Sequence, residues 1–165
     1  MNEHIFLTGF MGAGKTTVGK FLSNCLNIAV IDTDYYIETV KEKKISGIFQ
    51  EEGEARFREY ESEALQEICK QSPKIITTGG GIVLSVKNRE LMKRKGKVFF
   101  LYCDLEETMR RLAMDDSRPL FKADLEQNKR RFEDRLPLYL EADFVIETTN
   151  KTVEQIIQEI ISCLE

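Results

Sequence analysis

The chain has 165 residues, of which 42% are hydrophobic, and a formal net charge of -4 at pH 7. This length suits one domain with a substantial core and leaves little room for another, so we expect a single domain over residues 1–165. The acidic balance argues against nucleic acid or an anionic membrane as a partner. The first residues show no signal-peptide pattern and the four cysteines form no C-x-x-C pair, which predicts a cytoplasmic protein with reduced thiols.

The first predicted strand, residues 5–8, leads into a glycine-rich loop. Residues 9–16, GFMGAGKT, fill the pattern G-x-x-x-x-G-K-[ST] ahead of a helix predicted over 15–26. Such a loop points backbone N–H groups at phosphate oxygens, and the helix adds its positive end. We expect Lys15 to reach the β- and γ-phosphates and the Thr16 hydroxyl to hold Mg²⁺. A chance match in an ordinary turn is disfavoured because the required strand and helix are both predicted.

Two carboxylates follow the next predicted strand, residues 29–31. Alternation along an extended segment would send Asp32 and Asp34 to the same side at the carboxyl end of the strand. We expect Asp32 to help hold a hydrated Mg²⁺ and Asp34 to orient or deprotonate an acceptor hydroxyl. The alternative is that Asp34 caps a helix beginning at Tyr35, a role that is compatible with catalysis.

A strongly charged helical stretch covers residues 53–61. Arg58 and Glu61 are three positions apart and share a helix face, where the carboxylate can hold the guanidinium ready for a planar carboxylate ligand. A surface ladder of Glu and Arg is the ordinary explanation for such a stretch. The binding role is favoured only in combination with the other motifs.

Three consecutive glycines, Gly79, Gly80 and Gly81, follow a strand predicted over 74–77. Glycine packs nothing and loses conformational entropy on folding, so three at the end of a strand indicate backbone that must touch a ligand. The alternative is a tight turn into a helix near Ser85, although a turn seldom needs three glycines.

Two further strands are predicted at 98–102 and 144–146, followed by an amphipathic helix over 152–164 with Thr152 as its N-cap. Five short strands separated by helices predict an α/β fold with a parallel sheet. Ligands of such sheets gather beyond the carboxyl ends of the strands, so all candidate residues should lie on one rim.

Taken in order, the motifs of this chain resemble those of the shikimate kinase family. They are the phosphate loop, D-T-D, G-E-x-x-F-R with its downstream Glu, G-G-G, R-P-L from Arg118 and R-x-P-L-Y-x-E-A from Arg135, and together they cover nearly the whole chain. The resemblance implies a three-layer α/β/α P-loop kinase fold with a five-stranded parallel sheet, a helical shikimate-binding segment at about residues 33–61 and a mobile lid at about 113–125.

The resemblance also implies the reaction. Members of this family transfer the γ-phosphoryl group of ATP to the 3-hydroxyl of shikimate, with Mg²⁺, on the way to chorismate and the aromatic amino acids. ATP and shikimate are therefore the expected partners, and we expect a monomer.

Family positions carry over onto this sequence residue by residue. The catalytic residues would be Asp34, Lys15 and Arg118, the last folding over the phosphates from the lid. Nucleotide contacts are assigned to Gly12, Ala13, Gly14, Lys15, Thr16, Thr17, Arg111 and Arg118, although Arg110 could replace Arg111. Shikimate contacts are assigned to Asp34, Phe49, Phe57, Arg58, Gly79, Gly80, Gly81 and Arg135. Thr16 and Asp32 would serve the metal.

Other classes of protein share parts of this pattern. A GTPase-type switch would need N-K-x-D and D-x-x-G motifs, and the sequence contains neither. A gluconate or nucleoside kinase is the closer alternative because its phosphate loop, lid and length would be similar, but it would not predict two clamping arginines beside three glycines. A binding module that has lost its activity is disfavoured because none of the expected chemical positions is degraded.

Overall fold

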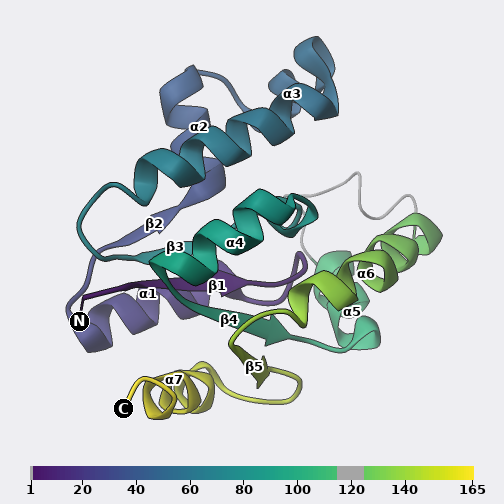
Figure 1. The fold of residues 1–165 in the computed structure, drawn as a ribbon. Helices are drawn as coiled ribbons and strands as arrows, with labels where there is room; N and C mark the ends of the chain where they lie inside the picture. The colour runs from purple at the N-terminus through teal and green to yellow at the C-terminus, as the bar shows by residue number, and fades with distance from the viewer. Residues whose placement is uncertain (1, 115–124) are drawn as a thin grey trace.

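The computed structural model describes residues 2–114 and 125–165, so Arg118 and most of the predicted lid lie outside the described residues. The described residues form a five-stranded sheet in the order β2-β3-β1-β4-β5, and each neighbouring pair is parallel (Figure 1). The strands are β1 (His4–Thr8), β2 (Val30–Asp32), β3 (Ile75–Thr77), β4 (Gly96–Tyr102) and β5 (Phe144–Glu147). The predicted α/β fold with a parallel sheet is confirmed.

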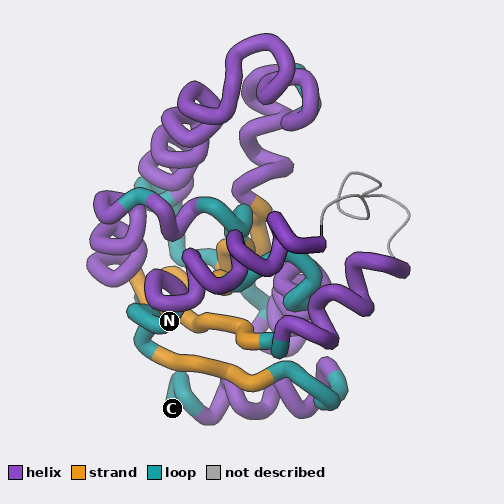
Figure 2. The backbone as a smooth tube through the Cα atoms, turned by 90° about the vertical axis from the view of Figure 1, so that its right-hand side faces the viewer, coloured by secondary structure: helices purple, strands orange, loops and turns teal. Residues whose placement is uncertain are grey.

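Helices cover both faces of the sheet (Figures 1 and 2). They are α1 (Lys15–Leu26), α2 (Thr33–Lys41), α3 (Ile45–Ile68), α4 (Val86–Lys95), α5 (Leu105–Met114), α6 (Leu125–Tyr139) and α7 (Val153–Ser162), with a 3₁₀ turn η1 (Ile82–Leu84) before α4. No helix within residues 2–114 and 125–165 is both long and apolar enough to cross a membrane.

Alternation along β1 explains the three layers. Ile5 and Leu7 face a core shared with α1 and α7, whereas Phe6 faces the opposite core, shared with α3, α4 and α6. A strand buried on both faces is continuously apolar, which is typical of a parallel sheet covered by crossover helices. The three-layer arrangement therefore follows directly from the sequence of the central strand.

Local signals place several helix ends. α1 has the predicted bounds, and α7 begins one residue after Thr152, whose hydroxyl accepts the N–H of Gln155 in a capping box. The strands differ from their predicted bounds by two residues at most, which is the usual uncertainty of element ends. The four cysteines carry free thiols, as predicted.

The segment α2–α3 projects from the sheet at the top of Figure 1. α3 is broken at Gly53, whose φ of 84° and ψ of 169° are not helical. The Tyr60 hydroxyl donates to Glu52 Oε2 at 2.6 Å and so ties the two halves of the helix together across this break. The charged stretch predicted as helical is therefore helical after Gly53.

The connection order places three loops beside one another. β3 lies between β1 and β2 in the sheet although it follows both in the chain, and β4 lies on the other side of β1. The loops after β1, β2 and β3 therefore emerge at the same edge, next to the point where the strand order reverses, where open α/β sheets bind ligands.

Candidate functional site

The phosphate-loop motif lies between β1 and α1, as predicted. Gly14 is the N-cap residue of α1 with a φ of 90°, a left-handed conformation that favours glycine. The Lys15 ammonium donates to the carbonyls of Gly9 at 2.6 Å and Phe10 at 2.9 Å. Ala13 is buried in the core, and its N–H donates to Phe10 O, while Thr16 and Thr17 are exposed in the first turn of α1. The open N-terminus of this helix is suited to an anion.

The D-T-D motif has a different backbone from the predicted one. The helix begins at Thr33, so Asp34 does not continue an extended strand, and the helix cap is Asp32 rather than Asp34. Asp32 Oδ1 accepts the N–H groups of Asp34 at 3.0 Å and Tyr35 at 3.1 Å, and its Oδ2 accepts the hydroxyl of Thr77 at 2.7 Å. The predicted alternation is wrong because a capping aspartate turns the chain directly from strand into helix, but Asp32 and Asp34 still line one cavity at the carboxyl end of the strand.

The triple glycine accommodates side chains of the protein itself. A Cβ on Gly79 would lie 2.6 Å from Asp34 Oδ1 and 3.0 Å from Glu61 Oε1, and a Cβ on Gly81 would collide with Arg58. The N–H of Gly79 donates to the buried hydroxyl of Thr33 at 3.0 Å, which fixes the loop to the start of α2. Gly79 and Gly81 therefore allow charged side chains to approach the backbone more closely than any other residue would.

Arg58 forms a largely buried ion pair with Glu61, in addition to an exposed one with Glu54. Arg58 Nη1 lies 2.6 Å from Glu61 Oε2, and the Glu61 side chain is only 1% exposed. Burial raises the pKa of the Glu61 carboxyl, and the nearby Arg58 guanidinium opposes that effect. Among the described residues, Arg58 Nε and Glu61 Oε1 are buried without a hydrogen-bond partner. Such groups indicate a place where a polar ligand or water completes the hydrogen bonding.

Arg135, from a distant part of the sequence, also lies beside the triple glycine. It lies in α6, is 9% exposed, and its charge acts on Glu61. A Cβ on Gly80 would lie 3.6 Å from Arg135 Nη1, whereas Arg58 lies against Gly81. The two predicted arginines thus approach neighbouring glycines of one loop.

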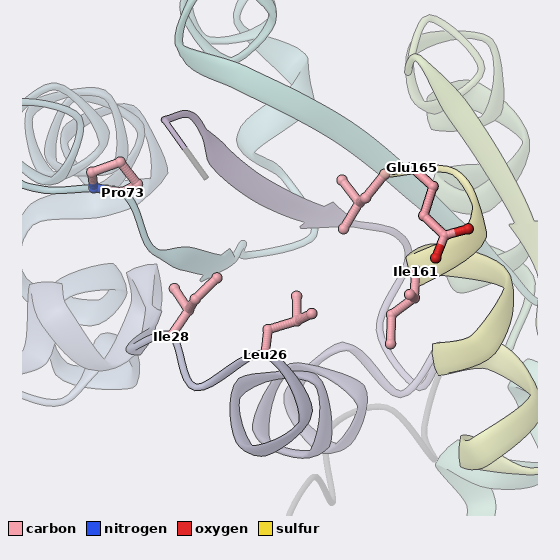
Figure 3. A pocket seen from close by; sticks show the side chains of 6 residues that line it. Leu26, Ile28, Pro73, Ile161 and Glu165 are labelled. Atoms are coloured by element: carbon pink, nitrogen blue, oxygen red, sulfur yellow. The ribbon is translucent and has the colours of Figure 1, made fainter.

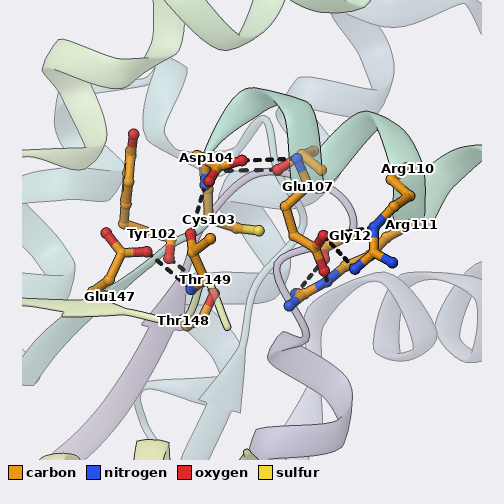
Figure 4. Close-up of polar contacts among 11 residues, drawn as sticks. Gly12, Tyr102, Cys103, Asp104, Glu107, Arg110, Arg111, Glu147, Thr148 and Thr149 are labelled. Atoms are coloured by element: carbon orange, nitrogen blue, oxygen red, sulfur yellow. Dashed lines mark hydrogen bonds and ion pairs between the residues drawn. The ribbon is translucent and has the colours of Figure 1, made fainter. Parts of the chain in front are cut away.

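Arg111, and not Arg110, contacts the phosphate loop. Arg111 Nη1 donates to Gly12 O at 3.2 Å while its Nε donates to Glu107 Oε1 at 2.9 Å (Figure 4). The exposed Arg110 donates to the other oxygen of Glu107. Glu107 therefore holds both arginines, but only Arg111 is directed at the loop.

The two predicted aromatic residues touch each other across the break in α3. The rings of Phe49 and Phe57 lie 4.7 Å apart between centroids, and Arg58 Cζ lies 5.3 Å from the centre of the Phe57 ring. Phe57 is buried, whereas Phe49 is 37% exposed. They form an apolar surface next to the guanidinium of Arg58.

A cavity of about 280 Å³ joins the three loops. It is lined by Met11, Gly12, Gly14, Lys15, Thr16, Thr17, Asp32, Asp34, Thr78, Gly79 and Gly80. Most of the sequence-predicted phosphate, metal and acceptor residues after β1, β2 and β3 therefore share one hollow, as expected for a single rim, whereas Ala13 and Gly81 do not border it. Its oxygen donors at Thr16 and Asp32 are the kind that a hydrated Mg²⁺ takes, and the described residues contain no group of three or more His, Cys, Asp or Glu that could hold a metal alone.

A second hollow, of about 480 Å³, lies at the opposite edge of the sheet (Figure 3). It is mainly apolar and is lined by Leu26, Ile28, Pro73, Ile161, Leu164 and Glu165. None of the predicted site residues borders it, so it has no part in the candidate site.

Sequence reasoning missed three residues that support the site. Thr33 holds Gly79, Thr77 holds Asp32, and Tyr139 donates its hydroxyl to Gly80 O. Thr33 and Thr77 adjoin predicted motifs, and Tyr139 belongs to the R-x-P-L-Y pattern. Their partners could not be found from the sequence because each contact joins distant parts of the chain.

Comparisons with known proteins show the family to which the chain is similar. A family model described as shikimate kinase matches residues 11–165. A shikimate kinase of Bacillus mycoides is 52% identical over 159 residues, which cover 96% of each chain, and one from Sulfurihydrogenibium is 40% identical over 97% of this chain and 96% of the relative. The structure of a shikimate kinase from Acinetobacter baumannii in complex with shikimate matches with a TM-score of 0.91 and 36% identity, covering 98% of this chain and 92% of that one. A gluconokinase from Sinorhizobium meliloti, covering 99% of this chain and 91% of that one with a TM-score of 0.63, is only 14% identical and shows a shared fold alone.

Proposed function

This chain belongs to the shikimate kinase family, and from that premise we propose how its own residues carry phosphoryl transfer from ATP to the 3-hydroxyl of shikimate. One observation supports the assignment above the others. Arg58 and Arg135 approach neighbouring glycines of one loop, and that loop borders the cavity shared by Asp34 and the phosphate loop. A small acid held by its carboxylate between these arginines would present its hydroxyls towards Asp34.

We assign the nucleotide to the phosphate loop. The N–H groups at the start of α1 face the phosphates, and Lys15 exchanges the carbonyls of Gly9 and Phe10 for β- and γ-phosphate oxygens. Thr16 and Asp32 would hold Mg²⁺, which when bound neutralises part of the phosphate charge. Arg111 supports the loop through Gly12, and Arg118 would act from the lid, outside the described residues.

We propose that Asp34 activates the acceptor hydroxyl. Its carboxylate orients the 3-hydroxyl and takes its proton as the hydroxyl oxygen bonds to the γ-phosphorus and the bond to the β-phosphate oxygen breaks. ADP and shikimate 3-phosphate are the products. Phe49 and Phe57 would cover the apolar side of the ring.

We also propose an oligomeric state and a cellular compartment for the enzyme. We propose that the protein acts as a monomer. The four free thiols support a reducing compartment, the cytoplasm.

The carboxylate clamp is tested by replacing Arg135 with Ala and comparing shikimate with its methyl ester. Loss of a charge-assisted contact to the carboxylate is expected to raise KM for shikimate by about 10- to 100-fold. KM for ATP should stay near the wild-type value, and the ester should lose far less than the acid. Arg130→Ala, which removes an exposed arginine from the same helix, serves as the control. Equal losses with acid and ester would contradict the clamp.

The two neighbouring arginines of α5 provide a matched pair. We expect Arg111→Ala to raise KM for ATP several-fold because the loop carbonyl of Gly12 and the nucleotide lose a cation, at about 1 kcal/mol for one such hydrogen bond. Arg110→Ala should leave KM for ATP unchanged, since the contacts of Arg110 within the described residues are with Glu107 Oε2. Steady-state kinetics with ATP varied would decide between them, and a larger effect at Arg110 would reverse the assignment.

A further inference from the structure

Tyr139 ends α6 with its hydroxyl against the triple-glycine loop. The residue is 2% exposed, and its ring stacks on Phe100 with centroids 4.9 Å apart and an interplanar angle of 15°. Its hydroxyl donates to the carbonyl of Gly80. Arg135 lies one turn earlier on the same helix, and its charge acts on the same hydroxyl.

The direction of this hydrogen bond follows from the groups involved. A carbonyl can only accept, whereas a phenol can donate. The phenolic hydrogen therefore goes to Gly80 O. Burial raises the pKa of Tyr139 to about 12, against the opposing effect of Arg135, so the hydroxyl keeps its hydrogen at neutral pH.

Arg135 and Tyr139 converge on one point of the backbone. A Cβ on Gly80 would lie 3.6 Å from Arg135 Nη1 and 3.6 Å from Tyr139 Oη. The Arg135 guanidinium is also attracted by Glu61 across the site. Without the phenol, the attraction of Glu61 would draw the Arg135 guanidinium away from the Gly80 peptide, because the arginine side chain is flexible.

We propose that Tyr139 is a positioning residue: its hydroxyl holds the Gly80 carbonyl beside Arg135 and so sets the distance between the carboxylate-binding guanidinium and the backbone of the acceptor site. The inference rests on the proposed function, because Arg135 and Gly80 are assigned to the acceptor there. It assigns no substrate contact to Tyr139 itself. Its effect should therefore appear in acceptor binding and depend on the acceptor's carboxylate.

The test compares Tyr139→Phe with the wild-type enzyme, using shikimate and its methyl ester as acceptors. Phenylalanine keeps the ring on Phe100 and removes only the hydroxyl. We expect KM for shikimate to rise about three- to tenfold, the change that one hydrogen bond produces. KM for the ester, KM for ATP and kcat should change less than twofold. Tyr102→Phe, on a tyrosine that packs on the same Phe100 ring, should leave all of these values unchanged.

Each other outcome has a definite meaning. An unchanged KM for shikimate, an equal rise with acid and ester, a parallel rise in KM for ATP, or loss of the folded state in a thermal melt would show a structural hydroxyl and overturn the proposal. If the wild-type enzyme does not distinguish shikimate from its methyl ester, the carboxylate clamp itself is overturned. If the wild type prefers shikimate to the ester and Tyr139→Phe keeps that preference, only the role of Tyr139 is overturned.

Discussion

Replacing Asp34 with Asn is expected to lower kcat by about 10²- to 10⁴-fold, the range for loss of a positioned general base. Asn has the same shape, so it should fit beside Gly79, where a Cβ would come within 2.6 Å of Asp34 Oδ1. It cannot take the proton of the acceptor hydroxyl. Binding of ATP, measured with a fluorescent analogue, should be unchanged because the phosphate loop lies on a different strand end. Rapid-quench measurement of the transfer step would isolate this effect from product release.

Asp134→Asn is the matched control for that variant. It makes the same chemical change on an exposed residue of α6 and should keep wild-type kcat. If Asp34→Asn retained nearly full kcat, proton transfer by Asp34 would be wrong, whatever its effect on KM.

The second large effect is expected for Lys15→Met. Methionine is an unbranched side chain one atom shorter than lysine, and it removes the charge that stabilises the moving phosphoryl group, which should cost about 10²- to 10³-fold in kcat. The variant also loses the hydrogen bonds from the ammonium to Gly9 O and Phe10 O. A thermal melt must therefore accompany the kinetics, so that a displaced loop is not mistaken for a missing charge.

Lys95→Met provides the comparison for the charge itself. Lys95 lies in the last turn of α4, is exposed, and should be replaceable without loss of activity. Addition of Mg²⁺ in excess should not restore Lys15→Met, since a metal cannot occupy the position of the ammonium. Recovery of more than half of the wild-type kcat would contradict the role of Lys15.

The fold was predictable because its signals are local. The alternation of Ile5, Phe6 and Leu7, the capping box at Thr152 and the spacing of apolar runs each depend on a few neighbouring residues. The order of strands in the sheet could not be predicted from neighbouring residues, because it depends on which distant segments pair. The sequence implied one rim for the site but not that β3 would lie between β1 and β2.

The site was predicted less completely for the same reason. The types of residue at Lys15, Asp34 and Arg58 could be related to chemistry from their motifs, but burial could not. Glu61 is predicted as a partner for Arg58 by its spacing, yet its near-complete burial depends on the packing of α3 over the triple-glycine loop. The capping role of Asp32 was missed because helix and strand compete at D-T-D, and the hydrogen bonds from Asp34 and Tyr35 decide the competition.

The structure was needed to show which of Arg110 and Arg111 contacts the phosphate loop. Adjacent residues on a helix point about 100° apart, and only the packing of α5 against the phosphate loop determines which one faces Gly12. Tyr139 shows a similar limit, because its partner Gly80 is 59 positions away in the sequence.

Whether shikimate is the acceptor can be measured by following ADP release in a coupled assay with Mg²⁺ and ATP, with shikimate, quinate, gluconate and a panel of nucleosides as acceptors. We expect turnover that depends on shikimate and exceeds that with every other acceptor, together with formation of shikimate 3-phosphate in equal amount to ADP. Faster turnover with another acceptor, or ADP release that does not depend on shikimate, would contradict the assignment of Arg58, Arg135 and the triple glycine to the acceptor.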